Sequence, residues 1–191
     1  MNLDEYRKRY ADDSSPGWDA LNVQLEDVYQ GQEPKHWGTL IKHMLGGPDP
    51  IDGISAYSCL DNGMPHLHFC TFGYSSLYYD EEAVGGDYSK YGFEMTFRLA
   101  ADLPPKDDPL WVCNLLQNLA RYVFETGNHF AHGHWIPANS PIHADSDTEL
   151  VGLAFLSDPV LQPVDTPHGL VEYVQAFGIT QHELDALMTK E

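Results

Sequence analysis

Basic residues are scarce in this sequence. Its 191 residues include 10 Lys and Arg against 29 Asp and Glu, which gives a formal net charge of −19. A protein that binds a phosphate backbone needs Lys and Arg to displace the counterions, so this balance excludes nucleic acid as the expected partner. The same charge keeps the chain soluble and favours basic partners.

Long apolar runs are missing, and cysteine is rare. No apolar run approaches the roughly 18 residues of a membrane span, so an integral membrane protein is excluded. Cys59, Cys70 and Cys113 form no Cys-x-x-Cys pair and no zinc framework, and they are interpreted as small buried residues. The start, MNLDEYRKRYADD, has a basic cluster but no apolar stretch behind it, unlike a secretory signal. We therefore expect a cytoplasmic protein with reduced cysteines.

The composition that is present predicts a packed core. Hydrophobic residues make up 42% of the chain and aromatic residues 12%, which suits a globular domain of this length. Apolar spacing predicts helices over residues 1–10, from Ser15-Pro16 to Gly31, after Asp108-Pro109 as far as Gly127, and from a Thr180/Glu183 capping box. The apolar spacing of residues 36–45 fits a helix or a strand; a turn signal follows at Gly46–Pro50, and we favour a strand. Alternation and turn signals predict further strands at Gly53–Cys59, His66–Phe72, Tyr91–Leu99, 132–137, 149–156 and 170–177. This order predicts an α+β fold, a mixed or antiparallel sheet with packed helices.

The histidines are the first candidates for chemistry. His129, His132 and His134 lie within six residues, and His66 and His68 share one face of a predicted strand. Three imidazoles can supply a catalytic zinc site. The spacing, however, is not the helical His-Glu-x-x-His pattern, and no Cys or acidic ligand lies at a matching offset. The competing interpretation, which we favour, is partly buried or loop histidines bonded to the backbone.

Other catalytic patterns are absent. The sequence has no Gly-x-Ser-x-Gly elbow, no Gly-x-Gly-x-x-Gly turn and no phosphate loop. Adjacent acids such as Glu81 and Glu82 are typical of a solvated surface run rather than an acid and base pair. We therefore expect no enzyme activity, no cofactor and no metal.

Recognition of another protein remains. Glu94 and Arg98 lie on the polar face of the Tyr91–Leu99 strand, and an acidic loop, Asp80–Asp87, precedes it. The run of Tyr74, Tyr78 and Tyr79 supplies large, stiff contact area. Clustered acids steer basic partners toward such a surface. The alternative is that the tyrosines belong to the edge of the core and that the loop only keeps the chain soluble.

Several segments resemble the suppressor-of-fused family. They are GGPDPIDGISAY, PHLHFCTFGYSSLY, YGFEMTFRL, LARYVFETGN and QPVDTPHGLVEYVQAFGIT. The resemblance runs from about Pro16 to Leu187, so we expect an N-terminal helical extension at 1–15 and a suppressor-of-fused-like domain at 16–191. It implies an α+β fold and a non-enzymatic role in holding another protein. We expect a stand-alone, bacterial-type version of this domain.

The resemblance also implies particular contact residues. Eukaryotic members capture a peptide as an added strand, beside a tyrosine that corresponds to Tyr78 and an acidic residue that corresponds, with a one-residue offset, to Asp87. Main-chain pairing at a sheet edge supplies affinity, and side-chain pockets supply specificity. Together with the polar strand face, the expected partner-binding residues are Tyr78, Asp87, Glu94 and Arg98.

Three functions follow as hypotheses. The first is an immunity protein that sequesters a basic toxin domain, because bacterial single-domain relatives are thought to act in this way and the acidity suits a basic cleft. The second is a metal-dependent hydrolase that uses His129, His132 and His134. The third is a regulator that binds a cellular protein by strand addition.

Overall fold

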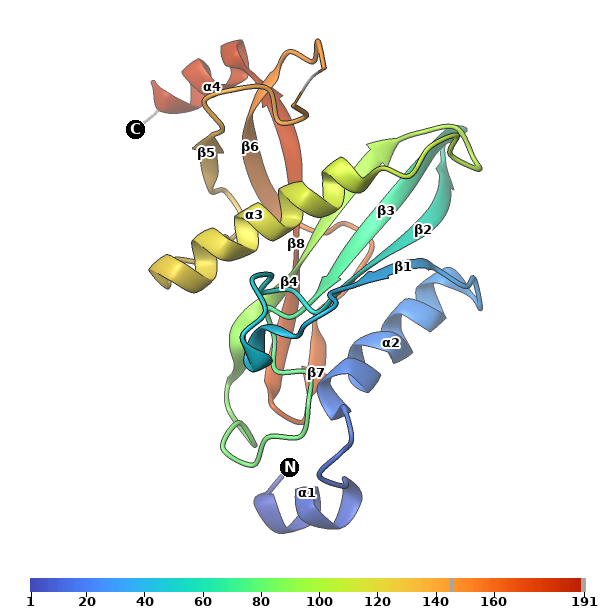
Figure 1. Cartoon of the computed structure of the whole chain (residues 1–191), viewed down its shortest axis with the longest axis vertical. Helices are drawn as coiled ribbons and strands as arrows, with labels where there is room; N and C mark the ends of the chain where they lie inside the picture. The colour runs from blue at the N-terminus through green and yellow to red at the C-terminus, as the bar shows by residue number, and fades with distance from the viewer. Residues whose placement is uncertain (145, 190–191) are drawn as a thin grey trace.

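The computed structural model describes residues 1–144 and 146–189 (Figure 1). Their helices are α1 (Leu3–Arg9), α2 (Pro16–Tyr29), α3 (Leu110–Thr126) and α4 (Gln181–Met188), with one 3-10 turn, η1 (His43–Leu45). Their strands are β1 (Lys35–Gly38), β2 (Gly53–Asp61), β3 (Met64–Phe72), β4 (Tyr88–Ala100), β5 (Trp135–Pro137), β6 (Leu150–Ser157), β7 (Val164–Thr166) and β8 (Gly169–Thr180). Among these residues, no helix is both long and apolar enough to span a bilayer.

The strands form one mixed sheet in the order β1-β2-β3-β4-β8-β6-β5, with β7 paired to β8. The pair β4 and β8 is parallel, and the other pairs are antiparallel. A parallel pair needs a crossover connection, and α3 lies within the one that joins β4 to β8. The expected α+β class with a mixed sheet is confirmed.

Helices cover both faces of the sheet. On one face α3 packs against Phe69, Phe93, Met95 and Phe97 of the central strands, and Figure 1 shows this helix crossing the sheet. On the other face lie Leu21 and Leu25 of α2, in a cluster with β2, β3 and β8. Alternate residues of one strand therefore enter two different cores.

The polar face of the Tyr91–Leu99 strand is not a surface. The strand itself is confirmed as part of β4, but Glu94 and Thr96 have no exposed area and Arg98 is half-buried. The expectation of an exposed polar face is wrong because α2 and the segment after β6 cover it, with Tyr29 and Asp158 among the covering residues. Alternation of polar and apolar residues is typical of a half-buried strand, and here the polar half is buried too.

Two predicted helix starts differ in detail. Ser15 is the N-cap of α2 with Pro16 at the first position, as expected, but its side chain makes no capping bond. Helix α3 begins at Leu110 with Pro109 as N-cap, so Asp108 does not cap it. The Thr180/Glu183 capping box of α4 is confirmed, with Glu183 N–H bonded to the Thr180 hydroxyl at 3.4 Å.

The segment 36–45, which we expected to be a strand, is mostly not one. Strand β1 ends at Gly38, and residues 39–47 form a tight loop around η1. Gly47 N–H donates to the Lys42 carbonyl at 3.1 Å, and a Cβ on Gly47 would lie 1.9 Å from the Ile41 carbonyl oxygen. Because only glycine allows this approach of the backbone to itself, the chain turns here rather than extending.

Candidate functional site

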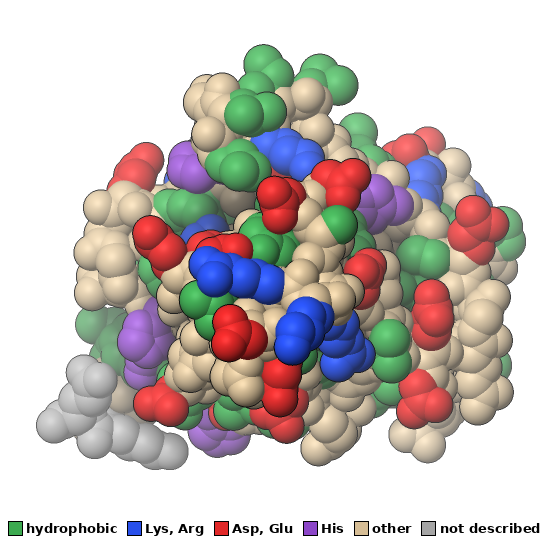
Figure 2. Space-filling model, turned by 90° about the horizontal axis from the view of Figure 1, so that it is seen from below, with side chains coloured by type: hydrophobic (Ala, Val, Ile, Leu, Met, Phe, Trp, Pro, Cys, Tyr) green, Lys and Arg blue, Asp and Glu red, His purple; other side chains and the backbone are tan. Residues whose placement is uncertain are grey.

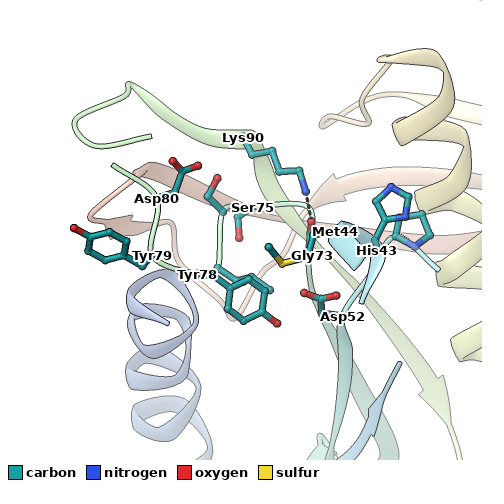
Figure 3. A pocket seen from close by; sticks show the side chains of 12 residues that line it. His43, Met44, Asp52, Gly73, Ser75, Tyr78, Tyr79, Asp80 and Lys90 are labelled. Atoms are coloured by element: carbon teal, nitrogen blue, oxygen red, sulfur yellow. Dashed lines mark hydrogen bonds between the residues drawn. The ribbon is translucent and has the colours of Figure 1, made fainter. Parts of the chain in front are cut away.

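An open groove of about 500 Å³ lies beside Tyr78 (Figure 3). Its walls come from the turn after β3, from the start of β4 and from the loop around η1; they include Asp52, Gly73, Ser75, Tyr78, Asp80 and Lys90. Tyr78 is half-buried, and the Lys42 ammonium lies 3.8 Å from the centre of its ring. Burial, together with a hydrogen bond to Asp52 and the charge of that carboxylate, raises the pKa of Tyr78 above its usual range. The side chain is therefore a fixed, neutral phenol in the groove.

Glu94 supports this groove from below. Its side chain has no exposed area, and its carboxylate accepts five hydrogen bonds from the turn after β3 and from β3 itself. The donors are Gly73 N–H and Ser75 N–H at 3.0 Å, Ser75 O–H at 2.6 Å, Thr71 O–H at 2.7 Å and Tyr74 N–H at 3.4 Å. Burial nevertheless raises the pKa of Glu94, because these bonds offset only part of the desolvation cost. Glu94 offers no area to a partner and acts as a positioning residue.

Lys90 forms the opposite wall. Its ammonium donates to the Gly73 carbonyl at 3.0 Å, drawn as a dashed line in Figure 3, and lies 4.3 Å from the centre of the Phe124 ring. Desolvation of the ammonium lowers the pKa of Lys90, although the residue as a whole is exposed. Its φ of 55° is in the left-handed region, which a lysine rarely adopts. The carbonyl bond and the aromatic contact therefore hold the side chain over the groove.

The acidic loop is held by α1. Tyr6 has no exposed area, and its hydroxyl accepts the Asp80 N–H at 3.0 Å and lies 2.7 Å from His168 Nε2. His168 Nδ1 lies 2.9 Å from the Ser76 carbonyl oxygen. A carbonyl only accepts, so Nδ1 carries the hydrogen and neutral Nε2 accepts the Tyr6 O–H. One phenol thus joins α1, the start of the acidic loop and the β7–β8 turn.

A second contact between α1 and this loop is at the surface. The Arg7 guanidinium donates to both carboxylate oxygens of Glu81, at 2.9 and 2.5 Å, and Tyr79 O–H donates to one of them at 2.7 Å. The hydrogen bonds from Arg7 and then Tyr79 lower the pKa of Glu81 to about 2. Exposed ion pairs contribute little to stability, so Tyr6 is the main anchor.

Removing the Tyr6 hydroxyl is expected to loosen the loop. In Tyr6→Phe the ring stays, but Asp80 N–H and His168 lose their partner, so amide hydrogen exchange at Asp80 is expected to rise about tenfold. Exchange measured by NMR on the free protein tests this. Tyr10→Phe, whose hydroxyl has no bond in the described residues, is the control. Equal exchange at Asp80 in both variants would show that α1 does not hold the loop.

Asp87 lies at the end of the acidic loop, exposed, just before β4. Its carbonyl accepts the Leu170 N–H at 3.1 Å, which fixes the backbone while the carboxylate faces solvent. It is not among the residues that line the groove. Of the four expected contact residues, Tyr78 lies in the groove and Asp87 lies on the neighbouring loop. Tyr74, which we expected on the tyrosine surface, lies in the core.

Arg98 belongs to a different cleft, of about 320 Å³, at the other end of β3 and β4. Its guanidinium donates to Asp61 at 3.2 Å and lies 3.6 Å from Asp158. The cleft is lined also by Tyr29, His66 and His68. Glu94 and Arg98 therefore do not form one surface.

A buried network joins this cleft to the core. Asp158 accepts Thr96 O–H at 2.7 Å, His68 Nε2–H at 2.9 Å and the backbone N–H groups of Val160 and Leu161 at 2.8 and 2.9 Å. Burial opposes ionisation of Asp158, but these bonds outweigh it and hold the pKa of the carboxyl well below its usual range. His68 donates from Nε2, so its neutral Nδ1 accepts the Tyr29 O–H at 2.5 Å. Burial lowers the pKa of His68, which keeps the imidazole neutral.

The three clustered histidines do not converge. His129, His132 and His134 are all exposed, and two of them accept separate backbone N–H groups, from Ser157 and Ala131. Across the described residues, no group of three or more His, Cys, Asp or Glu side chains is placed to hold a metal ion. The metal-site hypothesis therefore gains no support from the geometry.

The chain is similar in sequence to known proteins. A family model for "Suppressor of fused protein (SUFU)" matches residues 47–191. The human "Suppressor of fused homolog" is 37% identical over 177 residues, which is 88% of this chain and 36% of the human protein, and the mouse protein is 36% identical over the same length. The chain thus spans little more than a third of the curated relatives that it matches.

Solved structures show the same similarity. A Sufu–Fu complex has a TM-score of 0.85 at 36% identity, over 92% of this chain and 80% of that one. Drosophila Suppressor of Fused has a TM-score of 0.82 at 36% identity, over 92% and 44%. A putative homologue from Neisseria gonorrhoeae, with a TM-score of 0.56 at 13% identity over 91% and 82%, shares the fold alone.

Proposed function

Because this chain belongs to the suppressor-of-fused family, whose model covers residues 47–191, we propose that it is a non-enzymatic module that holds a segment of another protein in the groove beside Tyr78. The observation that carries the proposal is the construction of the groove. Buried Glu94 fixes the turn at the floor of the groove through Gly73 N–H and Ser75 N–H. Lys42 packs on the Tyr78 ring, and Lys90 is bonded to the Gly73 carbonyl. A preformed site lowers the ordering cost of binding. A related protein is seen in a Sufu–Fu complex, which supports a protein ligand.

The finer proposal is an immunity protein that acts in the cytoplasm against a basic toxin domain. The net charge of −19 supports it, since an acidic surface complements the basic cleft of a nuclease. The acidic loop beside the groove, with Asp80, Glu82 and Asp87 exposed, carries part of this charge.

Tyr78→Ala is expected to weaken partner binding. The test is co-expression with toxin genes that neighbour this gene, followed by measurement of complex formation and toxin neutralisation. Loss of the half-buried ring is expected to lower affinity by about tenfold or more. The control is Tyr122→Ala, which replaces an exposed tyrosine on α3.

Partner binding is also expected to weaken steeply as the salt concentration rises, because charge interactions beyond about 8–10 Å are screened.

Two results would reject the proposal at different levels. If no neighbouring toxin is bound or neutralised, the immunity role is rejected, and the protein-binding role then requires a partner other than a toxin. If a bound partner is indifferent to Tyr78→Ala, the groove is not its site.

Strand addition is the second candidate function. The described sheet ends at β1 and β5, and β5 has three residues, one of them Pro137, which has no N–H to donate. Strand β1 is therefore the better edge for a cellular partner. Hydrogen exchange in a complex separates the two functions, because protection of residues 35–38 indicates strand addition and protection of 73–80 indicates the groove.

A further inference from the structure

The loop between β1 and β2 exposes large apolar residues. Its apolar side chains face solvent: Leu40 is fully exposed, Ile41 is 55% exposed, Met44 70% and Leu45 73%. We call residues 40–45 the apolar knob. Figure 2 shows hydrophobic side chains gathered on a protrusion of the molecule. Its polar residues, Lys42 and His43, are exposed as well, but each contacts an aromatic ring of the protein, Tyr78 and Phe124 respectively.

The knob is held in this orientation. His43 packs edge-on against Phe124, with ring centres 5.2 Å apart, and its Nδ1 lies 3.1 Å from the Gly47 carbonyl oxygen. Lys42 lies over the Tyr78 ring, and its carbonyl accepts Leu45 N–H at 2.9 Å. The contacts of the polar residues thus fix a turn that presents the apolar ones outward. Holding four large apolar side chains in water is unfavourable unless something covers them.

The knob adjoins the groove. Met44 and His43 line it, and in Figure 3 Met44 lies near Asp52 and Gly73. Two lysines lie here as well: Lys42 contacts Tyr78, and Lys90 bonds to the Gly73 carbonyl. They balance the two carboxylates that line the groove, Asp52, which bonds to Tyr78, and Asp80. The excess negative charge lies on the neighbouring acidic loop, so the surface is aliphatic beside an acidic loop.

Charge decides between the possible occupants. Two copies of a chain with a net charge of −19 repel each other, which opposes self-association through this surface. A basic partner is attracted by the same charge. We propose that the apolar knob is a docking surface for a protein segment that carries aliphatic side chains and Lys or Arg. This inference rests on the proposed function and names the chemistry of its partner.

Methyl NMR of the methionines tests the knob directly. Met44 reports on it, and exposed Met64 and Met188 report on general attraction elsewhere. The probe is an amidated peptide of two Lys-Leu-Ala-Lys-Leu-Ala-Lys repeats. We expect a saturable shift of the Met44 methyl, with smaller shifts of Met64 and Met188. Peptides with Glu in place of Lys, or Ser in place of Leu, are expected to bind at least about tenfold more weakly.

A double variant identifies the surface. The double variant Ile41→Ser with Leu45→Ser is expected to bind the probe peptide about tenfold or more weakly, because each aliphatic side chain covered in the complex contributes to affinity. Both positions are exposed, so the fold is retained. Leu60→Ser, an exposed leucine at the far end of β2, is the control and is expected to bind as the wild type does.

Three outcomes would overturn the proposal. The first is binding of the peptide without a Met44 shift, and the second is an equal shift of all exposed methionines, which shows charge attraction alone. The third is a Met44 shift that depends on protein concentration without peptide, which shows that a second copy covers the knob. The proposed function is tested separately. Partner binding lost in Tyr78→Ala with an unshifted Met44 methyl supports the groove and rejects the knob, whereas partner binding that Tyr78→Ala leaves unchanged rejects the groove.

Discussion

Asp158→Ala is expected to lower the free energy of unfolding by about 3–5 kcal/mol, because four hydrogen-bond donors then lose their acceptor in the core. They belong to Thr96, His68 and the backbone of Val160 and Leu161. Cooperative urea unfolding measures the change. Asp165→Ala, an exposed aspartate on β7, is the control and is expected to stay within about 0.5 kcal/mol of the wild type.

The pH dependence of the same difference tests the mechanism. The pKa of folded Asp158 lies below its unfolded value, so its contribution is present above about pH 4 and is lost as the pH falls further. Likewise, the lowered pKa of His68 means that stability falls as the pH drops below about 6.5. The difference in the free energy of unfolding between the wild type and Asp158→Ala should therefore become smaller below about pH 4. A gap independent of pH would mean that Asp158 is not a buried carboxylate.

The second large effect is expected for Glu94→Gln, about 2–3 kcal/mol of lost stability. Glutamine has the same shape as glutamate, but all five hydrogen bonds of Glu94 are donated to its carboxylate oxygens. The amide nitrogen of glutamine cannot accept a hydrogen bond. Because Gly73 and Ser75 line the groove, the substitution should also weaken a partner held beside Tyr78.

Glu172→Gln separates this effect from loss of a charge. Glu172 is exposed on β8, so its substitution removes one negative charge and no bond within the described residues. If Glu94→Gln unfolds at the same urea concentration as Glu172→Gln, the carboxylate does not anchor the turn.

Local patterns in the sequence predict the elements well, and distant contacts explain where they fail. The alternation of Tyr91–Leu99 predicts a strand correctly, because side-chain spacing along a strand is a local property. It says nothing about what covers each face. Sequence spacing alone predicts Glu94 on a partner surface, because its donors, at residues 71–75, are brought to it only by strand pairing.

The network around Asp158 cannot be predicted from spacing in the sequence, for the same reason. Its members come from α2, β3, β4 and the segment after β6, which no spacing rule connects. One signal was available: Asp158 stands before Pro159 at the end of an apolar strand, where an aspartate commonly caps the following turn. That pattern would have indicated an anchoring aspartate, although not its bond to His68.

The apolar knob shows a limit of hydrophobic periodicity. The apolar run at 36–45 fits either period, and the turn signal behind it leads to the prediction of a strand. Such an interpretation assumes that apolar side chains face a core of the same chain. Here Leu40 and Leu45 face solvent, and the contacts that hold the loop to the protein come from Lys42 and His43.

The position of β8 has a consequence for synthesis on the ribosome. This strand lies between β4 and β6 although α3 and three strands separate it from β4 in the chain. A nascent chain that ends before β8 therefore exposes the unpaired edges of β4 and β6, where other strands can add. Such intermediates are prone to aggregate, and the two pairings between non-consecutive strands, β4 with β8 and β6 with β8, slow their completion. We expect fragments that stop before Gly169 to depend on chaperones, whatever the stability of the finished protein.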